Sequence, residues 1–176
     1  GIRYGKYMNI SISQATLQDV DDIFRLSCAV HHQPPYTTLI PPEHLERFLA
    51  AFSEGSTFEP KFKAKLIRFI TAENHHVYVA RDGSRIVGYR MAERRGDDVF
   101  LHGLFVDDAY RGRGIGRALF TAPLTLVPKG GSAHLTVLAD NVVARTLYES
   151  QGFRVTTSPR TSFYGAPQLD MVWQNA

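Results

Sequence analysis

The sequence is poor in cysteine and contains no long apolar run. Its single cysteine, Cys28, has no partner for an intrachain disulfide, so we expect a reducing, cytoplasmic environment. No apolar segment approaches the roughly 20 residues that a membrane-spanning helix needs. The first residues lack the charged start and apolar stretch of a signal peptide. We therefore expect a soluble protein with no membrane partner.

The chain also lacks a strong excess of charge. Lys and Arg number 20, against 17 Asp and Glu. We expect residues 1–7 to be an appended segment ahead of a natural start at Met8. Without Arg3 and Lys6, the balance is closer still to neutral. A near-neutral chain gives little support to a nucleic-acid partner, and we predict none.

Internal repeats, low-complexity tracts and flexible linkers are absent from the sequence. A length of 176 residues with 44% apolar residues suits a single core. The mean hydropathy of -0.18 and the 11% aromatic content are not those of a disordered chain. We expect residues 8–176 to form one domain.

Hydrophobic periodicity predicts helices in the first half of the chain and strands from its middle onward. Strands are expected at 10–12, 77–80, 85–91, 99–106, 134–138, 153–157 and 168–173, and helices at 16–31, 42–52, 62–70, 115–123 and 141–151. The apolar strand 99–106 is expected to be central and covered on both faces. This order of elements predicts a mixed α/β domain.

A glycine-rich segment, Arg111-Gly112-Arg113-Gly114-Ile115-Gly116, connects the strand 99–106 to the next predicted helix. Backbone amides at a helix N-terminus attract anions, and glycines leave the approach open. A dinucleotide-binding fingerprint would need glycine where Arg117 stands. The single Gly-Lys pair, Gly5-Lys6, lacks the rest of a triphosphate loop. The segment therefore predicts a phosphate site of another kind.

Two motifs resemble the GNAT superfamily of N-acyltransferases. Arg111-x-x-Gly114-x-Gly116, following Leu104-Phe105-Val106, is similar to the acyl-CoA signature Q/R-x-x-G-x-G/A of that superfamily. Its helical motif N-x-x-A-x-x-x-Y-x-x-x-G-F is matched by Asn141, Ala144, Tyr148 and Gly152-Phe153. The resemblance is close over residues 76–157 and extends to the N-terminal helices by element order.

The resemblance implies a fold and a reaction. The fold would be a central, mostly antiparallel sheet, flanked by helices and splayed between its fourth and fifth strands, here 99–106 and 134–138. The reaction would use acetyl-CoA as cosubstrate and a primary amine as acceptor, by direct attack in a ternary complex. Many relatives dimerise, so the C-terminal strand is a candidate for pairing with a second copy in a homodimer.

The resemblance also implies roles for individual residues. Backbone amides of residues 113–117 would hold the pyrophosphate of CoA, and Arg111 would support the loop. The Leu104 amide would polarise the thioester carbonyl, and Tyr148 would protonate the departing thiolate. The candidate cofactor-binding residues are Leu104, Phe105, Val106, Arg111, Gly112, Arg113, Gly114, Ile115, Gly116, Arg117, Asn141, Ala144 and Tyr148.

The general base is a separate question, because an amine is mostly protonated at neutral pH. His102 is the candidate, and arylalkylamine-acetylating members carry a histidine at this position. Strict alternation places its side chain on the same face as that of Leu104, unless a bulge intervenes. Glu93, Asp98 and a water chain remain alternatives.

Several of these residues also have a purely structural interpretation. Asn141 is equally suited to cap a helix, and Tyr148 and His102 to lie in a core. The adjacent pairs His31-His32 and His75-His76 lack the spacing of a helical metal site, and we predict no metal. Cys28 is expected to be a small buried residue rather than a nucleophile.

The acceptor is the least determined feature. It is a small amine, such as a polyamine or an arylalkylamine, or a protein amine. Ser162-Phe163-Tyr164 faintly resembles bacterial polyamine acetyltransferases, and a polycation would need carboxylates. Candidates for these are Glu43, Glu46, Glu54, Glu59, Glu73 and Asp170. A non-catalytic acyl-CoA-binding module and, less favoured, a nucleic-acid-binding module are the alternative functions.

Overall fold

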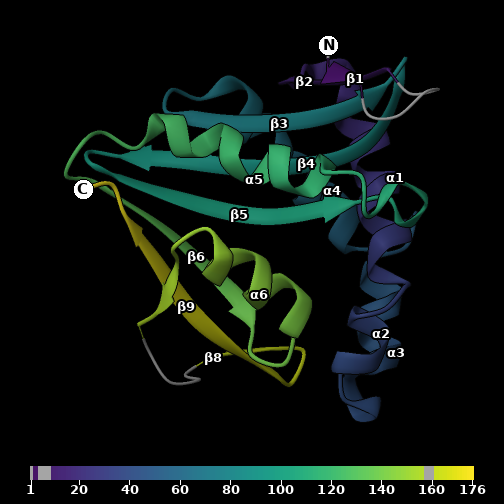
Figure 1. Ribbon diagram of the computed structural model, residues 1–176. Helices are drawn as coiled ribbons and strands as arrows, with labels where there is room; N and C mark the ends of the chain where they lie inside the picture. Colours follow the sequence, from purple (N-terminus) through teal and green to yellow (C-terminus); the bar gives the residue numbers. More distant parts are fainter. Residues whose placement is uncertain (1, 4–8, 157–160) are drawn as a thin grey trace.

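One mixed sheet runs through the computed structural model, which describes residues 2–3, 9–156 and 161–176 (Figure 1). The strand order is β1-β2-β3-β4-β5-β6-β9-β7, with β8 paired to β9. The strands are β1 (Ile2–Arg3), β2 (Asn9–Gln14), β3 (His75–Asp82), β4 (Arg85–Arg95), β5 (Asp98–Val106), β6 (Ser132–Leu138), β7 (Arg154–Val155), β8 (Thr161–Phe163) and β9 (Ala166–Gln174). The helices are α1 (Val20–His31), α2 (Tyr36–Leu39), α3 (Pro42–Ala51), α4 (Phe58–Thr71), α5 (Ile115–Thr121) and α6 (Val142–Ser150).

The sheet opens between β5 and β6. These strands run parallel and pair through Asp98–Leu101 and Ser132–Leu135, whereas the other described strand pairs are antiparallel. Beyond the paired residues β5 and β6 diverge (Figure 1). They correspond to the fourth and fifth strands expected from the sequence. Their labels are one higher because Ile2–Arg3 forms an additional strand, β1, which pairs with β2. The predicted fold class and splay are thereby confirmed.

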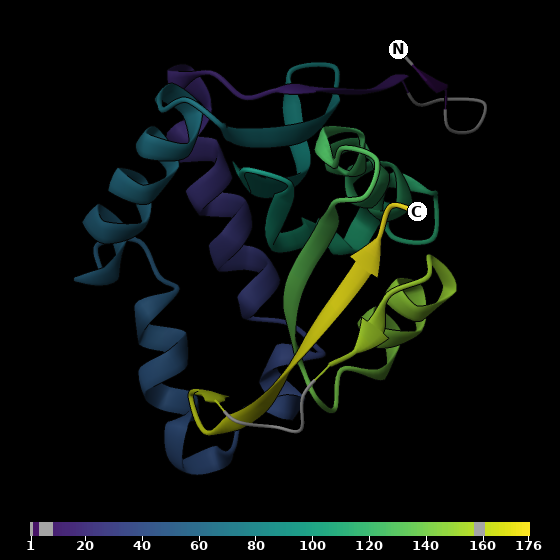
Figure 2. The ribbon, with the colours of Figure 1, turned by 90° about the vertical axis from the view of Figure 1, so that its left-hand side faces the viewer.

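Helices cover both faces of the sheet (Figure 2). α5 and α6 lie over one face, where Leu119, Phe120 and Tyr148 join the largest hydrophobic cluster. α1 and α4 lie over the other face and bring Phe24, Leu66 and other apolar residues to a second cluster. α3 packs against the end of β9 and the residues beside it in a third cluster. The two wings of the splayed sheet are therefore joined on one side by α1 to α4.

Local sequence explains where the helices begin and end. Thr16 and Asp19 form a capping box ahead of α1, and the Thr16 amide donates to the Asp19 carboxylate at 2.8 Å. Pro42 occupies the first turn of α3, where a missing amide is tolerated. α5 ends at Thr121, and the next turn, which contains Pro123, is a 3-10 helix. These boundaries agree with the sequence-based expectations.

Three expectations need correction. β5 is not covered on both faces, because Val99 and Leu101 are buried whereas Phe100 and residues 102–106 are partly or fully exposed, and β6 leaves it beyond Leu101. The short helix α2 and strand β8 lie where no element was expected. The strand expected at 153–157 is reduced to β7, and its last residue, Thr157, lies outside the described residues. In the described part of the chain, no helix is long and apolar enough to span a bilayer.

Candidate active site

A β-bulge shapes β5 at the point where β6 leaves it. β4 contributes Arg90 alone where β5 contributes Gly103 and Leu104. Gly103 has a φ of 63°, and a Cβ atom there would lie 2.7 Å from the Phe105 ring. Glycine is therefore required at this position. Arg90 Nε donates to the Gly103 carbonyl oxygen at 2.8 Å and so holds the bulge from the neighbouring strand.

The bulge places the His102 and Leu104 side chains on opposite faces of the sheet. Strict alternation would give a shared face, but the exception expected for a bulge applies here. His102 meets the Phe69 ring of α4 edge-on, with 5.5 Å between centroids. Leu104 instead packs on the cluster beneath α5 and α6. Two residues of β5 occupy the place of one in the bulge. The side chains that follow therefore point to the opposite faces from those that strict alternation predicts.

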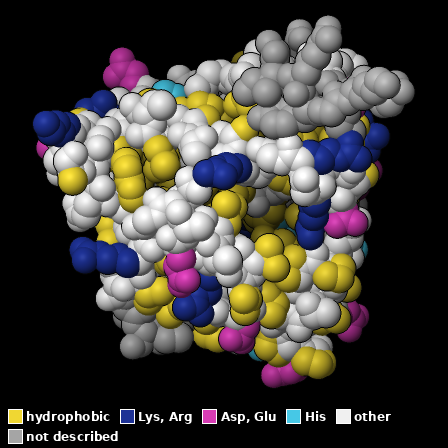
Figure 3. Space-filling view, in the orientation of Figure 1, with side chains coloured by type: hydrophobic (Ala, Val, Ile, Leu, Met, Phe, Trp, Pro, Cys, Tyr) yellow, Lys and Arg dark blue, Asp and Glu magenta, His cyan; other side chains and the backbone are white. Residues whose placement is uncertain are grey.

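A cavity of about 870 Å³ lies in the wedge between β5 and β6. Figure 3 shows a hollow near the centre of the face that carries α5 and α6, with hydrophobic side chains along its lower rim. Its lining includes His102, Leu104, Phe105, Asn141, Ala144 and Tyr148, together with His31, Tyr36, Phe52, Phe58, Lys61, Phe62 and Lys65 from the helical side. The candidate base, the bulged strand and the candidate acid thus share one cavity, whereas Glu93 and Asp98 are not part of its lining.

The glycine-rich loop is open to solvent at the end of β5. Residues 111–114 are exposed, and a Cβ atom on Gly112 would meet nothing within 4 Å. Gly114 is the N-cap of α5 with a left-handed φ of 81°. A Cβ atom on Gly116 would lie 3.8 Å from Val106, so the first turn of α5 rests against the strand. The loop therefore fits a diphosphate, since its residues 111–114 are exposed at a helix N-terminus beside an open strand edge.

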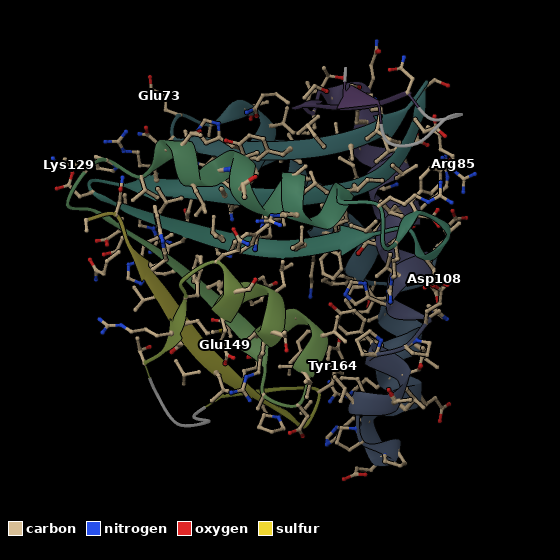
Figure 4. The ribbon with its side chains drawn as sticks, viewed as in Figure 1. Glu73, Arg85, Asp108, Lys129, Glu149 and Tyr164 are labelled. Atoms are coloured by element: carbon tan, nitrogen blue, oxygen red, sulfur yellow. The ribbon has the colours of Figure 1, made fainter. Side chains whose placement is uncertain are left out.

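The arginines of the loop are held by local contacts. Arg111 Nε lies 3.3 Å from the Asp108 carboxylate, and its Nη2 donates to the Pro34 carbonyl at 3.4 Å. The Arg113 guanidinium lies 5.5 Å from the centroid of the Tyr110 ring. Figure 4 shows Asp108 at the edge of the molecule beside this loop. Arg111 therefore links the loop to the segment that joins α1 and α2, while Arg117 is exposed on α5.

Tyr148 is buried on α6 and faces Arg90. Its ring stacks on Phe120 with 5.3 Å between centroids. Burial raises the pKa of the Tyr148 hydroxyl, and the charge and hydrogen-bonding capacity of the Arg90 guanidinium partly oppose this rise. Tyr148 is therefore protonated at neutral pH. A guanidinium only donates, so Arg90 offers no acceptor for the phenolic proton of Tyr148.

Arg90 is the residue that the sequence-based analysis missed. It is 1% exposed, and its Nη1 has no hydrogen-bond partner within the described ranges. An arginine is almost never buried without a carboxylate partner. The signal was present in the sequence, because Arg90 interrupts the otherwise apolar run from Ile86 to Ala92.

Asn141 and Ala144 begin α6 at the edge of the cavity. The Asn141 side-chain oxygen accepts the Ala144 amide at 3.3 Å, so Asn141 caps the helix. Both residues also line the cavity. The two interpretations of Asn141 therefore coexist in geometry, since the cap uses the oxygen and leaves the side-chain nitrogen to donate.

His102 belongs to a cluster centred on Glu93. His102 Nε2 lies 3.3 Å from Glu93 Oε1, and His75 Nε2 lies 3.1 Å from Glu93 Oε2. Burial is the main cause that lowers the pKa of His102, and the charge of Lys65 adds to it, while Glu93 acts in the opposite direction. Burial alone would raise the pKa of Glu93, but hydrogen bonds from Arg95 and His102 hold it below its usual value. At neutral pH, His102 is therefore a neutral imidazole beside a carboxylate.

The remaining candidates have other environments. Asp98 lies 2.9 Å from His134 Nε2 at the far, paired end of β5. Burial raises the pKa of the Cys28 thiol to about 11, so it is not a thiolate at neutral pH. Among the described residues, no group of three or more His, Cys, Asp and Glu side chains is arranged to hold a metal ion.

A wedge beside a bulged strand, with an anion-attracting loop at its end, is typical of a transferase that binds a long acyl carrier. The model of a family described as an acetyltransferase (GNAT) domain matches residues 41–175. The chain therefore belongs to the GNAT acetyltransferase family, whose acyl donor is acetyl-CoA. The family predicted from the two motifs is confirmed.

Curated relatives match part of the chain. The N-alpha-acetyltransferase RimI of Mycobacterium tuberculosis is 37% identical over 100 residues, which are 54% of this chain and 63% of RimI. The uncharacterized protein ML0378 of Mycobacterium leprae is 38% identical over 105 residues, which are 56% of this chain and 28% of that protein. The chain thus spans less than two thirds of the length of these relatives.

Solved structures match nearly the whole fold. The PaiA N-acetyltransferase of Thermoplasma acidophilum, in complex with coenzyme A, aligns with a TM-score of 0.75 at 18% identity, over 95% of this chain and 99% of that one. The ribosomal-protein-S18-alanine N-acetyltransferase of Escherichia coli aligns with a TM-score of 0.70 at 21% identity, over 96% and 95%. At these identities the likeness extends to the fold alone.

Proposed function

We propose that this chain transfers the acetyl group of acetyl-CoA to a primary amine by direct attack, with both substrates bound together. The main support is that Leu104, His102 and Tyr148 line one cavity, beside a strand edge that β6 has left. A donor, an acceptor and the groups that move protons need such a common space.

The donor lies along β5. The amides of residues 113–117 hold the diphosphate, and Arg111 keeps the loop in place through Asp108. The pantetheine arm occupies the edge of β5 beyond Leu101 and pairs with the backbone of Leu104 and Val106, as an added strand would. The Asn141 side-chain nitrogen, which the helix cap leaves available, donates to a carbonyl of this arm.

The bulge prepares the acetyl group for attack. Leu104 is the second residue of the bulge, so its backbone departs from the regular ladder toward the cavity. We assign its amide to the thioester carbonyl oxygen, which gains negative charge as the amine attacks. One such donor contributes about 3 kcal/mol to transition-state stabilisation. Arg90 supports this arrangement through the Gly103 carbonyl.

Proton transfer uses two sides of the cavity. The neutral imidazole of His102 takes a proton from the amine, directly or through water, and Glu93 stabilises the imidazolium that forms. Tyr148 donates its proton to the sulfur of the departing CoA. The Arg90 guanidinium has no acceptor atom, so the Tyr148 hydroxyl does not donate to it and is available to donate to the sulfur.

The acceptor is a primary amine of a small molecule or a protein. RimI carries the name of an N-alpha-acetyltransferase, and the E. coli structural neighbour is named for a ribosomal protein. Of the six carboxylates considered for a polycation, Asp170 lines the cavity, whereas Glu54 pairs with Arg25 and Glu59 with Lys63. Several aromatic rings also line the cavity from the helical side, which supports an acceptor with an apolar body.

Acetyl-CoA consumption with an amine panel tests the proposal. We expect free thiol to appear only when both acetyl-CoA and an accepted amine are present, and the product to carry one acetyl group by mass spectrometry. Binding of acetyl-CoA, seen as a thermal shift, without transfer to any member of a panel of small amines and peptides would identify a binding module instead.

A further inference from the structure

Two lysines of α4 lie at the cavity. Lys61 and Lys65 are one helical turn apart and both line it. Lys63, between them, points away and binds Asp21 at 2.9 Å and Glu59 at 3.1 Å. One lysine of this helix is therefore engaged in ion pairs, whereas two line the cavity on the acceptor side.

Lys61 and Lys65 have no carboxylate within 4.0 Å in the described ranges, and the residues outside these ranges include no Asp or Glu. Glu93 interacts electrostatically with Lys65, but its oxygens are occupied by Arg95, His75 and His102. Neither lysine is therefore held in an ion pair within the described ranges, although Glu93 acts on Lys65 from a distance and Asp170 lies elsewhere in the lining of the same cavity.

The surroundings make this charge effective. Lys65 Nζ lies 5.7 Å from the centroid of the Phe69 ring. Burial, followed by the charge of Arg68, lowers the pKa of Lys65. Both lysines are exposed residues, and an ammonium group that lacks an ion-pair partner is available to an incoming anion.

We propose that the acceptor of this enzyme is an amine that also carries an anionic group, a carboxylate or a phosphate, which binds Lys61 and Lys65 while the amine reaches His102. This inference rests on the proposed function and names its acceptor class. Phe58 and Phe62 stand beside the two lysines on α4 and also line the cavity. An apolar body between the amine and the anion would therefore be accommodated, and a polyamine would be repelled.

Matched amines test the proposal. The pairs are tryptophan against tryptamine, phenylalanine against phenethylamine, and phosphoethanolamine against ethanolamine, with spermidine as the polycation. We expect the anionic member of at least one pair to have a kcat/KM at least tenfold higher, and spermidine to be poor. The first two pairs report on a carboxylate and the third on a phosphate. Equal or better use of the neutral members and of spermidine would overturn the proposal.

Substitution of the two lysines tests whether they cause the preference for anionic amines. In Lys61→Met/Lys65→Met, the ratio of kcat/KM between the anionic and the neutral member should fall at least tenfold, mainly through KM. In Lys61→Glu/Lys65→Glu, the kcat/KM for spermidine should exceed that for the anionic amine. Lys129→Met is the matched control, because Lys129 is exposed at the edge of the molecule before β6 (Figure 4) and should leave the ratio unchanged. An unchanged ratio in both double variants, with folding verified by circular dichroism, would refute the assignment.

The proposed function and the anionic acceptor can each be refuted separately. If the wild-type protein binds acetyl-CoA but acetylates no amine, the proposed function fails. If it acetylates neutral or cationic amines best, the function stands and the anionic acceptor is wrong. A preference for anionic amines that survives loss of both lysines would contradict this site alone.

Discussion

The donor side and the acceptor side of the cavity differ in how they are built. On the donor side, the loop at 111–116, the bulge in β5 and the cap of α6 are mostly backbone features, and glycine is needed at two of them. On the acceptor side, α1 to α4 contribute side chains such as His31, Phe52 and Lys65. Backbone geometry can bind the same donor in many relatives, while side chains are free to vary with the acceptor. A change on the donor side should therefore affect every reaction, and one on the acceptor side should affect selected amines.

The largest effect is expected at the loop. Gly114→Glu places a carboxylate at the proposed diphosphate site and a side chain on a residue with a φ of 81°. We expect acetyl-CoA affinity to fall more than 100-fold by calorimetry, equally with every amine. Gly96→Glu is the control, because Gly96 has a φ of 61° in a turn with nothing within 4 Å of a Cβ atom. Wild-type affinity in Gly114→Glu would show that the loop does not hold the donor.

The next effect concerns the acid. Tyr148→Phe removes the phenolic proton but keeps the stacking on Phe120. We expect kcat to fall about 100-fold, which is typical of a lost general acid, while the dissociation constant of acetyl-CoA stays within threefold. Tyr78→Phe is the control, since Tyr78 is also buried but does not line the cavity. Steady-state rates measure kcat, and stopped-flow binding kinetics measure the dissociation constant of acetyl-CoA. A wild-type kcat would remove Tyr148 from the mechanism.

The pH profile of an Arg90 variant distinguishes an electrostatic role of Arg90 from a purely structural one. Its charge opposes the rise of the Tyr148 pKa that burial causes. In Arg90→Gln we therefore expect the basic limb of the kcat profile to move to higher pH, with a lower plateau. The shift should be absent in the Tyr148→Phe background. Arg94→Gln, on the exposed end of β4, is the matched control. A lower kcat with an unmoved limb would make Arg90 a support for the bulge alone.

Much of the donor side could be predicted from the sequence, because glycines and spacing report backbone geometry directly. The loop and the cap at Asn141 follow from such signals, whereas the splay between β5 and β6 was implied by the family resemblance. The bulge at Gly103 could not be placed, since a glycine in a strand indicates a weak point without fixing the register. That single residue changes which face His102 occupies. The acceptor side was harder to predict, because it depends on how α2, α3 and the β8–β9 turn pack together. The rings of Phe48 and Tyr164, for example, lie 5.3 Å apart between centroids.

The base lies between the two sides and should show an intermediate effect. Burial lowers the pKa of His102 below its usual value, so the neutral imidazole predominates at neutral pH and kcat/KM should decline only in the acidic range. Glu93 favours the protonated imidazole, so Glu93→Gln should move this acid limb to still lower pH. His102→Gln should lower kcat about tenfold or more. An acid limb that stays in place in both variants would favour another base, such as a water chain.

The smallest effect is expected on the scaffold of the acceptor side. Arg81 binds Asp19 at 2.9 and 2.5 Å and so joins the start of α1 to β3. The hydrogen bond from Arg81 is the main cause that lowers the pKa of Asp19. Asp19→Asn should cost about 2 kcal/mol of unfolding free energy, as charged hydrogen bonds do. Because the folded-state pKa is depressed, this difference should be complete above about pH 3.9 and vanish as the pH falls through the folded pKa. Urea titrations at several pH values measure it, with the exposed Asp22→Asn as control. A loss in Asp19→Asn that persists in acid would point to the helix cap rather than the ion pair, and α1 would then be fixed by its own sequence.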